Sequence, residues 1–196
     1  ENFAQMMNRE AQRLGMKASS FRNSTGLPDP QHYTTARDLA TLAGALIRDF
    51  PEDYAKYYSI KEFRYNNITQ PNRNRLLWLD PTVDGVKTGH TDAAGYCLIS
   101  SAKRDTRRLI SVVLGTKSDA VRAQESLKLL NFGFQAYDAV KLYAKDDAVA
   151  NLPVWKGQAK TLKAGFTEDF IMVVPKGYGP RIKSELQSHQ PLIAPV

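Results

Sequence analysis

The fold of this chain is decided by the stretch Asp84-Gly85-Val86-Lys87-Thr88-Gly89-His90-Thr91-Asp92-Ala93-Ala94-Gly95-Tyr96. It predicts a strand that ends near Gly89, a short loop, and a second strand that begins at Gly95. Lys87 and Thr88 are then expected at the edge of a sheet, where a peptide can add through backbone hydrogen bonds. Gly89 has no side chain to obstruct the close approach of that peptide. Because Lys87 is cationic and Thr88 carries a hydroxyl group, the edge is suited to hold a carboxylate.

The residues after this stretch continue it as an antiparallel meander that ends in a helix. Turn signals and apolar runs predict strands over 95–102 and 108–115, with the charged turn 103–107 between them. The strand over 108–115 is almost continuously apolar, which is typical of a buried strand. Helical spacing then predicts a helix from Asp119 to about Tyr137.

Upstream of the meander, two helices are expected. Apolar residues at helical spacing predict them over 3–14 and 36–48, with Thr34 or Thr35 as the cap of the second. The remaining expected segments are the loops 19–33 and 66–75 and the short strand 60–65.

Beyond residue 137 the pattern changes to short alternating runs separated by glycine and proline, which is typical of a small all-β unit. The runs lie at 148–155, 159–164, 169–174 and 181–187. The sequence therefore predicts two domains, residues 1–137 and 138–196.

Composition and charge narrow the class of protein. The 196 residues carry a formal net charge of +7, but the basic residues are spread along the chain, which disfavours a nucleic-acid-binding patch. Cys97 is the single cysteine, so no disulfide forms within the chain. No run reaches the 18 or so apolar residues of a membrane span. The three histidines lack the spacing of metal ligands, and neither a metal nor a cofactor is expected.

Several stretches together resemble a known family. Lys87-Thr88-Gly89 is a weak signal alone, but the run 83–91 and the stretches 23–28, 35–40 and 72–78 are similar to the low-molecular-mass penicillin-binding proteins. These are the serine-type D-alanyl-D-alanine carboxypeptidases of peptidase family S11. The resemblance covers nearly the whole chain. It implies an α/β (α+β) transpeptidase- or β-lactamase-like domain, with an antiparallel sheet covered by helices, followed by a small all-β sandwich domain.

The resemblance also implies a reaction and a site. The enzyme would remove the terminal D-alanine from the peptidoglycan pentapeptide through an acyl-enzyme, and β-lactam antibiotics would acylate it. Lys87 and Thr88 would bind the carboxylate region, next to Gly89, and the backbone N–H of His90 would donate to the oxyanion. These four residues are the catalytic candidates of this chain. Two arginines that match substrate-binding arginines of the family complete the site, Arg73 and Arg122.

Other polar and aromatic residues of these stretches are assigned to simpler roles. The family assigns the general base to a lysine, so His90 is not expected to act as one. Trp78 and Phe63 are expected to pack in the core, and Tyr96 to pack below its strand.

The chain departs from the family at the nucleophile. The family motifs Ser-x-x-Lys and Ser-x-Asn both precede the helix expected at 3–14. One string in this chain has the Ser-x-x-Lys pattern, Ser100-Ser101-Ala102-Lys103. It lies in an expected strand, where Ser100 and Lys103 point to opposite faces. The nucleophile is therefore expected outside this chain, in an N-terminal segment of the same protein, and the chain alone is expected to be inactive.

The expected location follows from the same resemblance. The enzymes act in the periplasm, peripheral to the bacterial inner membrane, and the family often ends in an amphipathic membrane helix. Membrane association is thus expected only through a C-terminal segment that this sequence lacks.

Two other classes of function remain open. The chain could bind peptide ends or peptidoglycan without catalysis, or act as a structural partner of another chain. Labelling with a fluorescent penicillin separates these possibilities from the enzyme. A basic nucleic-acid-binding protein is the third possibility, and it would retain DNA in a strongly salt-dependent way.

Overall fold

The computed structural model describes residues 2–188 and 190–195. By its internal contacts the chain separates into two compact units, Glu1–Gly133 and Phe134–Val196. Each unit is built around its own sheets, and each is described by itself.

The first unit contains the predicted meander. Its three strands are β3 (Val83–Thr91), β4 (Gly95–Arg104) and β5 (Arg107–Thr116). Both pairings are antiparallel, and the strand order is β3-β4-β5. Strand β4 lies in the middle and is the most buried, whereas β3 pairs with β4 alone among the described residues. The edge strand that carries Lys87 is therefore confirmed, and it is longer than the sequence predicted.

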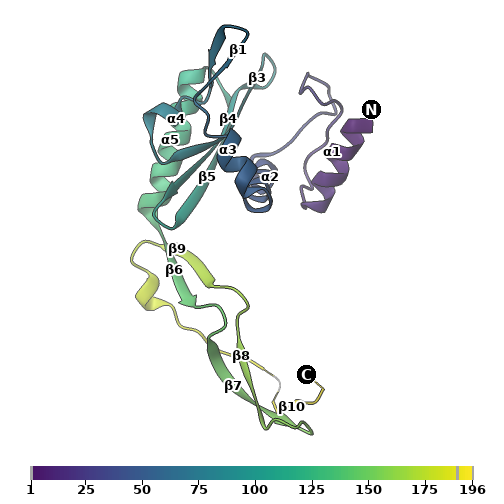
Figure 1. Ribbon diagram of the computed structural model, residues 1–196, viewed down its shortest axis with the longest axis vertical. Helices are drawn as coiled ribbons and strands as arrows, with labels where there is room; N and C mark the ends of the chain where they lie inside the picture. The colour runs from purple at the N-terminus through teal and green to yellow at the C-terminus, as the bar shows by residue number, and fades with distance from the viewer. Residues whose placement is uncertain (1, 189, 196) are drawn as a thin grey trace. The chain divides into compact units, whose positions relative to one another are not determined.

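Helices cover both faces of this sheet, as Figure 1 shows. Successive side chains of a strand point to opposite faces. On β5, Leu109 meets α5 (Asp119–Ala136), where a Cβ added at Gly133 would lie 2.7 Å from the Leu109 Cδ1 atom. Arg108 points the other way, with its Cζ atom 5.6 Å from the ring of Tyr54 in α3 (Pro51–Tyr57). This arrangement confirms the predicted sheet covered by helices.

The N-terminal part is tied together by side chains that bond to the backbone. It comprises α1 (Asn2–Arg13), a long loop and α2 (Ala36–Asp49). Asn8 of α1 exchanges two hydrogen bonds of 2.8 Å with the backbone of Phe21. The Thr35 hydroxyl accepts from the Asp38 N–H, so Thr35 rather than Thr34 is the helix cap. The predicted positions of both helices are confirmed to within a residue or two.

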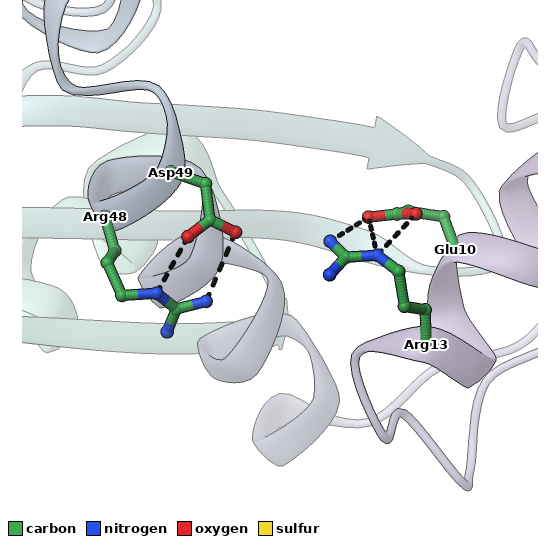
Figure 2. Close-up of polar contacts among 4 residues, drawn as sticks. All are labelled: Glu10, Arg13, Arg48 and Asp49. Atoms are coloured by element: carbon green, nitrogen blue, oxygen red, sulfur yellow. Dashed lines mark hydrogen bonds and ion pairs between the residues drawn. The ribbon is translucent and has the colours of Figure 1, made fainter.

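Two ion pairs face each other between α1 and the end of α2 (Figure 2). Arg13 bonds Glu10 at 2.5 Å, and Arg48 bonds Asp49 at 2.8 Å. The hydrogen bond from Arg13 lowers the pKa of Glu10. Because these side chains are largely exposed, solvent screens the pairs and they add little to stability.

The loop predicted over 66–75 is wrong in part. Strands β1 (Glu62–Tyr65) and β2 (Ile68–Pro71) form a hairpin. Its turn residues Asn66 and Asn67 both have positive φ, 48° and 59°, as a tight turn between paired strands requires. Two short helices were also not predicted: α3, which has Pro51 in its first turn, and α4 (Leu76–Leu79).

The second unit is rich in strands, as predicted. Strands β6 (Tyr137–Tyr143) and β9 (Phe170–Pro175) form an antiparallel pair, and the second sheet has the order β10-β7-β8. The strands of that sheet are β7 (Ala148–Trp155), β8 (Thr161–Gly165) and β10 (Leu192–Ile193). The rings of Tyr143, Phe166 and Phe170 stack together, with centroids 5.3 and 4.8 Å apart in successive pairs.

The sequence prediction was wrong in two places of this unit. The run 181–187 forms no strand, and its first residue ends a 3-10 turn at Gly179–Arg181. Alternation alone does not supply a partner strand, and Leu186 stays half exposed. Conversely, β6 was not predicted, because it follows α5 with no turn residues between them. In the described part of the chain, no helix is long and apolar enough to cross a membrane.

Candidate active-site cleft

A cleft of about 1110 Å³ runs along β3 in the first unit. It is lined by Thr25, Gln70, Pro71, Asn72, Arg73, Arg75, Trp78, Val86, Lys87, Thr88, Gly89, His90, Tyr96, Asp119 and Arg122. All six site residues predicted from the sequence are among them. They come from three places in the chain: the edge strand, the loop after the β1–β2 hairpin, and the first turn of α5.

Strand β3 brings its polar residues to the mouth of the cleft. Lys87 pairs with Ile99 across the ladder, and Thr88 pairs with Leu98. Their side chains consequently leave opposite faces of the strand. Lys87 is exposed, and its Nζ atom donates to the Thr88 carbonyl oxygen at 2.5 Å. The ammonium group thus lies against the edge itself, within reach of a ligand that enters the cleft.

Arg122 is the most deeply buried charge of the cleft, with 4% of its surface exposed. Its Nη1 atom donates to the carbonyls of Gly89 at 3.2 Å and Cys97 at 3.5 Å, and its Nη2 atom donates to the Arg73 carbonyl at 3.3 Å. No carboxylate in the described part of the chain lies within 4.0 Å of it. Burial lowers the pKa of Arg122, because the charged form is taken out of water.

The other cleft charges leave a positive excess. Arg75 forms an ion pair with Asp119 at 2.8 Å, so these two groups largely cancel. Arg73 is exposed and, among the described residues, has no carboxylate partner. Lys87, Arg73 and Arg122 are therefore three cationic side chains that no acidic group of the cleft neutralises. An anionic ligand fits this field.

Tyr96 lines the cleft, although it was not predicted to be a site residue. Its ring lies 4.0 Å from the ring of His90, centroid to centroid, and the Arg122 Cζ atom lies 5.5 Å from its centroid. The expectation that it packs below the strand is corrected, because it is the cross-strand partner of His90 and shares its face. No sequence signal identified this pairing, because the predicted strand ended near Gly89 and the register is seen only in the folded chain.

Two expected core aromatics are also exposed. Trp78 is 46% exposed and lines the cleft, and Phe63 is 61% exposed on the hairpin. In α4, Leu76 and Leu77, which precede Trp78, take the core positions next to β3 instead. Because α4 has a single turn, it can bury only one side, and that side presents the two leucines.

The structure offers no nucleophile from the Ser-x-x-Lys string. Ser100 is fully buried in β4, and its hydroxyl donates to the Gly85 carbonyl at 3.1 Å. Among the described residues that line the cleft, none is serine or cysteine. The exclusion of Ser100 from the nucleophile role is thus supported by its burial.

Comparisons with known proteins match both units. Residues 1–118 match the family model of D-alanyl-D-alanine carboxypeptidase, and residues 137–196 match that of the penicillin-binding protein 5 C-terminal domain. D-alanyl-D-alanine carboxypeptidase DacC of Escherichia coli is 42% identical over 100% of this chain and 49% of the relative. DacA of Haemophilus influenzae is 41% identical over 95% of this chain and 48% of the relative. The chain thus spans about half the length of these curated relatives.

Solved structures agree with the sequence relatives. Penicillin-binding protein 5 of Haemophilus influenzae has a TM-score of 0.92 and 40% identity, over 99% of this chain and 57% of that one. Penicillin-binding protein D2 of Listeria monocytogenes, in its cefotaxime-bound form, has a TM-score of 0.63 and 34% identity, over 68% of this chain and 55% of that one. Since the family model covers well over half of the residues, this chain belongs to the D-alanyl-D-alanine carboxypeptidase family.

Proposed function

We propose that this chain forms the carboxylate-binding side of the active site in a serine-type D-alanyl-D-alanine carboxypeptidase. The reaction removes the terminal D-alanine from the peptidoglycan pentapeptide. The observation that carries the proposal is the cleft, which gathers three unneutralised cations beside an unpaired strand edge. Residues 1–137 would belong to the peptidase domain and residues 138–196 to the β-rich domain that follows it.

Binding would begin with the substrate backbone adding along β3. An extended peptide can pair with a free strand edge, which aligns it with the cleft. Its terminal carboxylate would then meet Arg122, Lys87 and the Thr88 hydroxyl. Arg122 suits this role because a buried, desolvated guanidinium gains more from a carboxylate than an exposed one. Arg73 adds positive charge at the rim.

The chemistry would be acyl transfer through a serine that lies outside these 196 residues. The serine oxygen attacks the carbonyl carbon of the penultimate D-alanine, and its proton passes to the lysine of the Ser-x-x-Lys motif. The backbone N–H of His90 and that of the serine donate to the oxyanion, a donor of this kind being worth ~10²–10³ in rate. The C–N bond breaks, D-alanine leaves with the proton, and water hydrolyses the ester.

The same site would accept β-lactam antibiotics. A related structure, that of the Listeria protein, is described as cefotaxime-bound, and another as ampicillin-bound. The β-lactam carboxylate would take the place of the D-alanine carboxylate, and opening of the ring amide would leave the serine acylated. The enzyme would work in the periplasm, peripheral to the inner membrane, where peptidoglycan is accessible.

A labelling experiment tests the proposal. The protein is produced together with the Ser-x-x-Lys segment, incubated with a fluorescent penicillin, and assayed for D-alanine release from a pentapeptide. We expect covalent label, D-alanine release, and a loss of at least about tenfold in acylation rate for Lys87→Ala, because a charged contact is worth ~1.5–3 kcal/mol. An unchanged acylation rate in Lys87→Ala would remove Lys87 from the mechanism.

A non-catalytic role in binding peptide ends is the second candidate. It is favoured by the lack of serine and cysteine among the described residues that line the cleft. Under this candidate the protein binds D-alanyl-D-alanine peptides, as measured by calorimetry, yet takes up no penicillin label and releases no D-alanine.

A further inference from the structure

The pairing of strand β3 with β4 is irregular just before Lys87 and Thr88. Its ladder with β4 is interrupted between Val83 and Gly85, where the register shifts and Asp84 is left unpaired. A bulge of this kind can re-aim the residues that follow it. The opposite edge of β3 cannot supply support in the proposed enzyme, because it must stay open for the substrate. Backbone pairing from one side is therefore a weak constraint on where Lys87 and Thr88 lie.

Side chains hold the irregular segment on one face. The Tyr54 hydroxyl donates to the Asp84 Oδ1 atom at 2.9 Å. The Arg108 Nη1 atom forms an ion pair with the same carboxylate and lies 2.7 Å from its Oδ2 atom. Arg108 also donates to the Ser101 hydroxyl at 2.6 Å. A Cβ added at Gly85 would overlap the Tyr54 hydroxyl. Tyr54 is buried, and its burial raises its pKa, so the hydroxyl keeps the proton that it donates.

The Gly85 carbonyl is held from two further directions. The Asn74 Nδ2 atom donates to it at 2.9 Å, and the Ser100 hydroxyl donates at 3.1 Å. Asn74 is 2% exposed and directly follows Arg73, which lines the cleft. The same amide group accepts the Leu76 N–H at 3.2 Å, which fixes its orientation. Asn74 thus joins the Arg73 loop to β3 by a buried bond.

We propose that Tyr54, Asn74, Ser100 and Arg108 form an anchor around Asp84 and Gly85 that positions Lys87 and Thr88 for the substrate. Asp84 and Gly85 lie three and two residues before Lys87. The four side chains come from α3, β4, β5 and the loop before α4. Its members touch neither substrate nor reacting atoms, so they are positioning residues. The inference rests on the proposed function, since it concerns the geometry of that same site.

The test compares Tyr54→Phe and Asn74→Ala with a matched control. Tyr58 stacks on Tyr54 at 5.1 Å between ring centroids, and within the described residues its hydroxyl has no hydrogen bond, so Tyr58→Phe removes the same group outside the anchor. Each protein, carrying its Ser-x-x-Lys segment, is mixed with a fluorescent penicillin under single-turnover conditions. The amplitude of labelling measures the fraction of molecules that are folded. The acylation rate constant measures how well the site is arranged in those folded molecules.

We expect both anchor variants to lower the acylation rate constant by roughly tenfold or more, since a displacement of about 1 Å can cost 10²-fold. The control should keep the wild-type rate constant. A purely structural role would lower the amplitude and the melting temperature and leave the rate constant unchanged, and this result would overturn the proposal. If either anchor variant does not fold, Ser100→Ala takes its place. This variant keeps the hydrogen bond from Asn74 to the Gly85 carbonyl, and it must still lower the acylation rate constant. Failure of the proposed function is distinguishable, because the wild-type protein would then take up no label.

Discussion

Replacement of Arg122 by alanine tests the electrostatic role of the cleft. The guanidinium is 4% exposed, donates to three backbone carbonyls, and meets no carboxylate in the described part of the chain. Its effect on stability has two opposing parts. The variant loses charged hydrogen bonds worth about 1.5–3 kcal/mol each, but it also relieves the cost of keeping a charge out of water, several kcal/mol. We therefore expect the free energy of unfolding to change by less than about 2 kcal/mol.

Substrate binding offers no such compensation. A carboxylate that reaches Arg122 becomes its one counterion, and truncating one partner of such a buried pair costs on the order of 2–5 kcal/mol. At 1.4 kcal/mol per factor of ten, kcat/KM should fall roughly 30-fold to several thousand-fold. The measurement compares a peptide that ends in a free D-alanine carboxylate with the same peptide as its C-terminal amide.

The two substrates and a control decide the outcome. Arg122→Ala should impair cleavage of the free carboxylate far more than cleavage of the amide. Lys103→Ala removes one charge from an exposed position of β4 outside the cleft and should impair neither. Equal losses for acid and amide in Arg122→Ala would refute the reasoning, because the arginine would then act on the fold and not on the ligand charge.

Further predictions concern two glycines of β3 and one buried carboxylate. Gly85→Ala should destabilise the protein by about 1–3 kcal/mol in urea unfolding, because the new methyl group overlaps the Tyr54 hydroxyl; unchanged stability would contradict this. Gly89→Ala should leave stability nearly unchanged, since its Cβ meets only the Cys97 Cβ at 3.9 Å, and yet it should lower the rate of penicillin acylation. Asp80 is subject to burial, which raises its pKa, but hydrogen bonds from Thr82 and Arg104 outweigh this and lower the pKa below 3.8. The ionised Asp80 carboxylate thus stabilises the folded state above pH 3.8, and this stabilisation is lost as the pH falls through the pKa of Asp80 in the folded protein. Asp80→Asn should cost about 1–2 kcal/mol at pH 7, and the difference from wild type should shrink below pH 3.8; a difference independent of pH would count against the Asp80–Arg104 pair.

The meander was predictable from sequence because each of its strands announces itself locally. Gly95 and the charged turn 103–107 mark the reversals, and β5 is apolar over most of its length. The β1–β2 hairpin was missed since its turn uses Asn66 and Asn67, without glycine, in a stretch that is otherwise polar. Local patterns predict strands; they do not say which partner a strand finds, and the run 181–187 finds none.

The site divides in the same way. Lys87, Thr88 and Gly89 are contiguous, so a motif could identify them, whereas Arg122 and Arg73 were found only through resemblance to the family. Bonds between distant residues left no sign in the sequence. Tyr54 and Asp84 are 30 residues apart and Arg122 and Arg73 are 49 apart, and only the folded chain brings each pair together.

Gly85 and Gly89 show how the fold and the substrate impose separate demands on one strand. At Gly85 the protein itself occupies the space where a side chain would lie, so glycine is required before any ligand binds. At Gly89 the protein leaves that space open, and φ lies outside the left-handed region, so neither packing nor backbone conformation requires glycine there. Gly89 lines the cleft, and the remaining reason for a bare backbone at this position is the approach of another molecule. Within β3, a side chain at position 85 is thus excluded by the anchor, whereas the space beside position 89 is left open for the peptide that would add there.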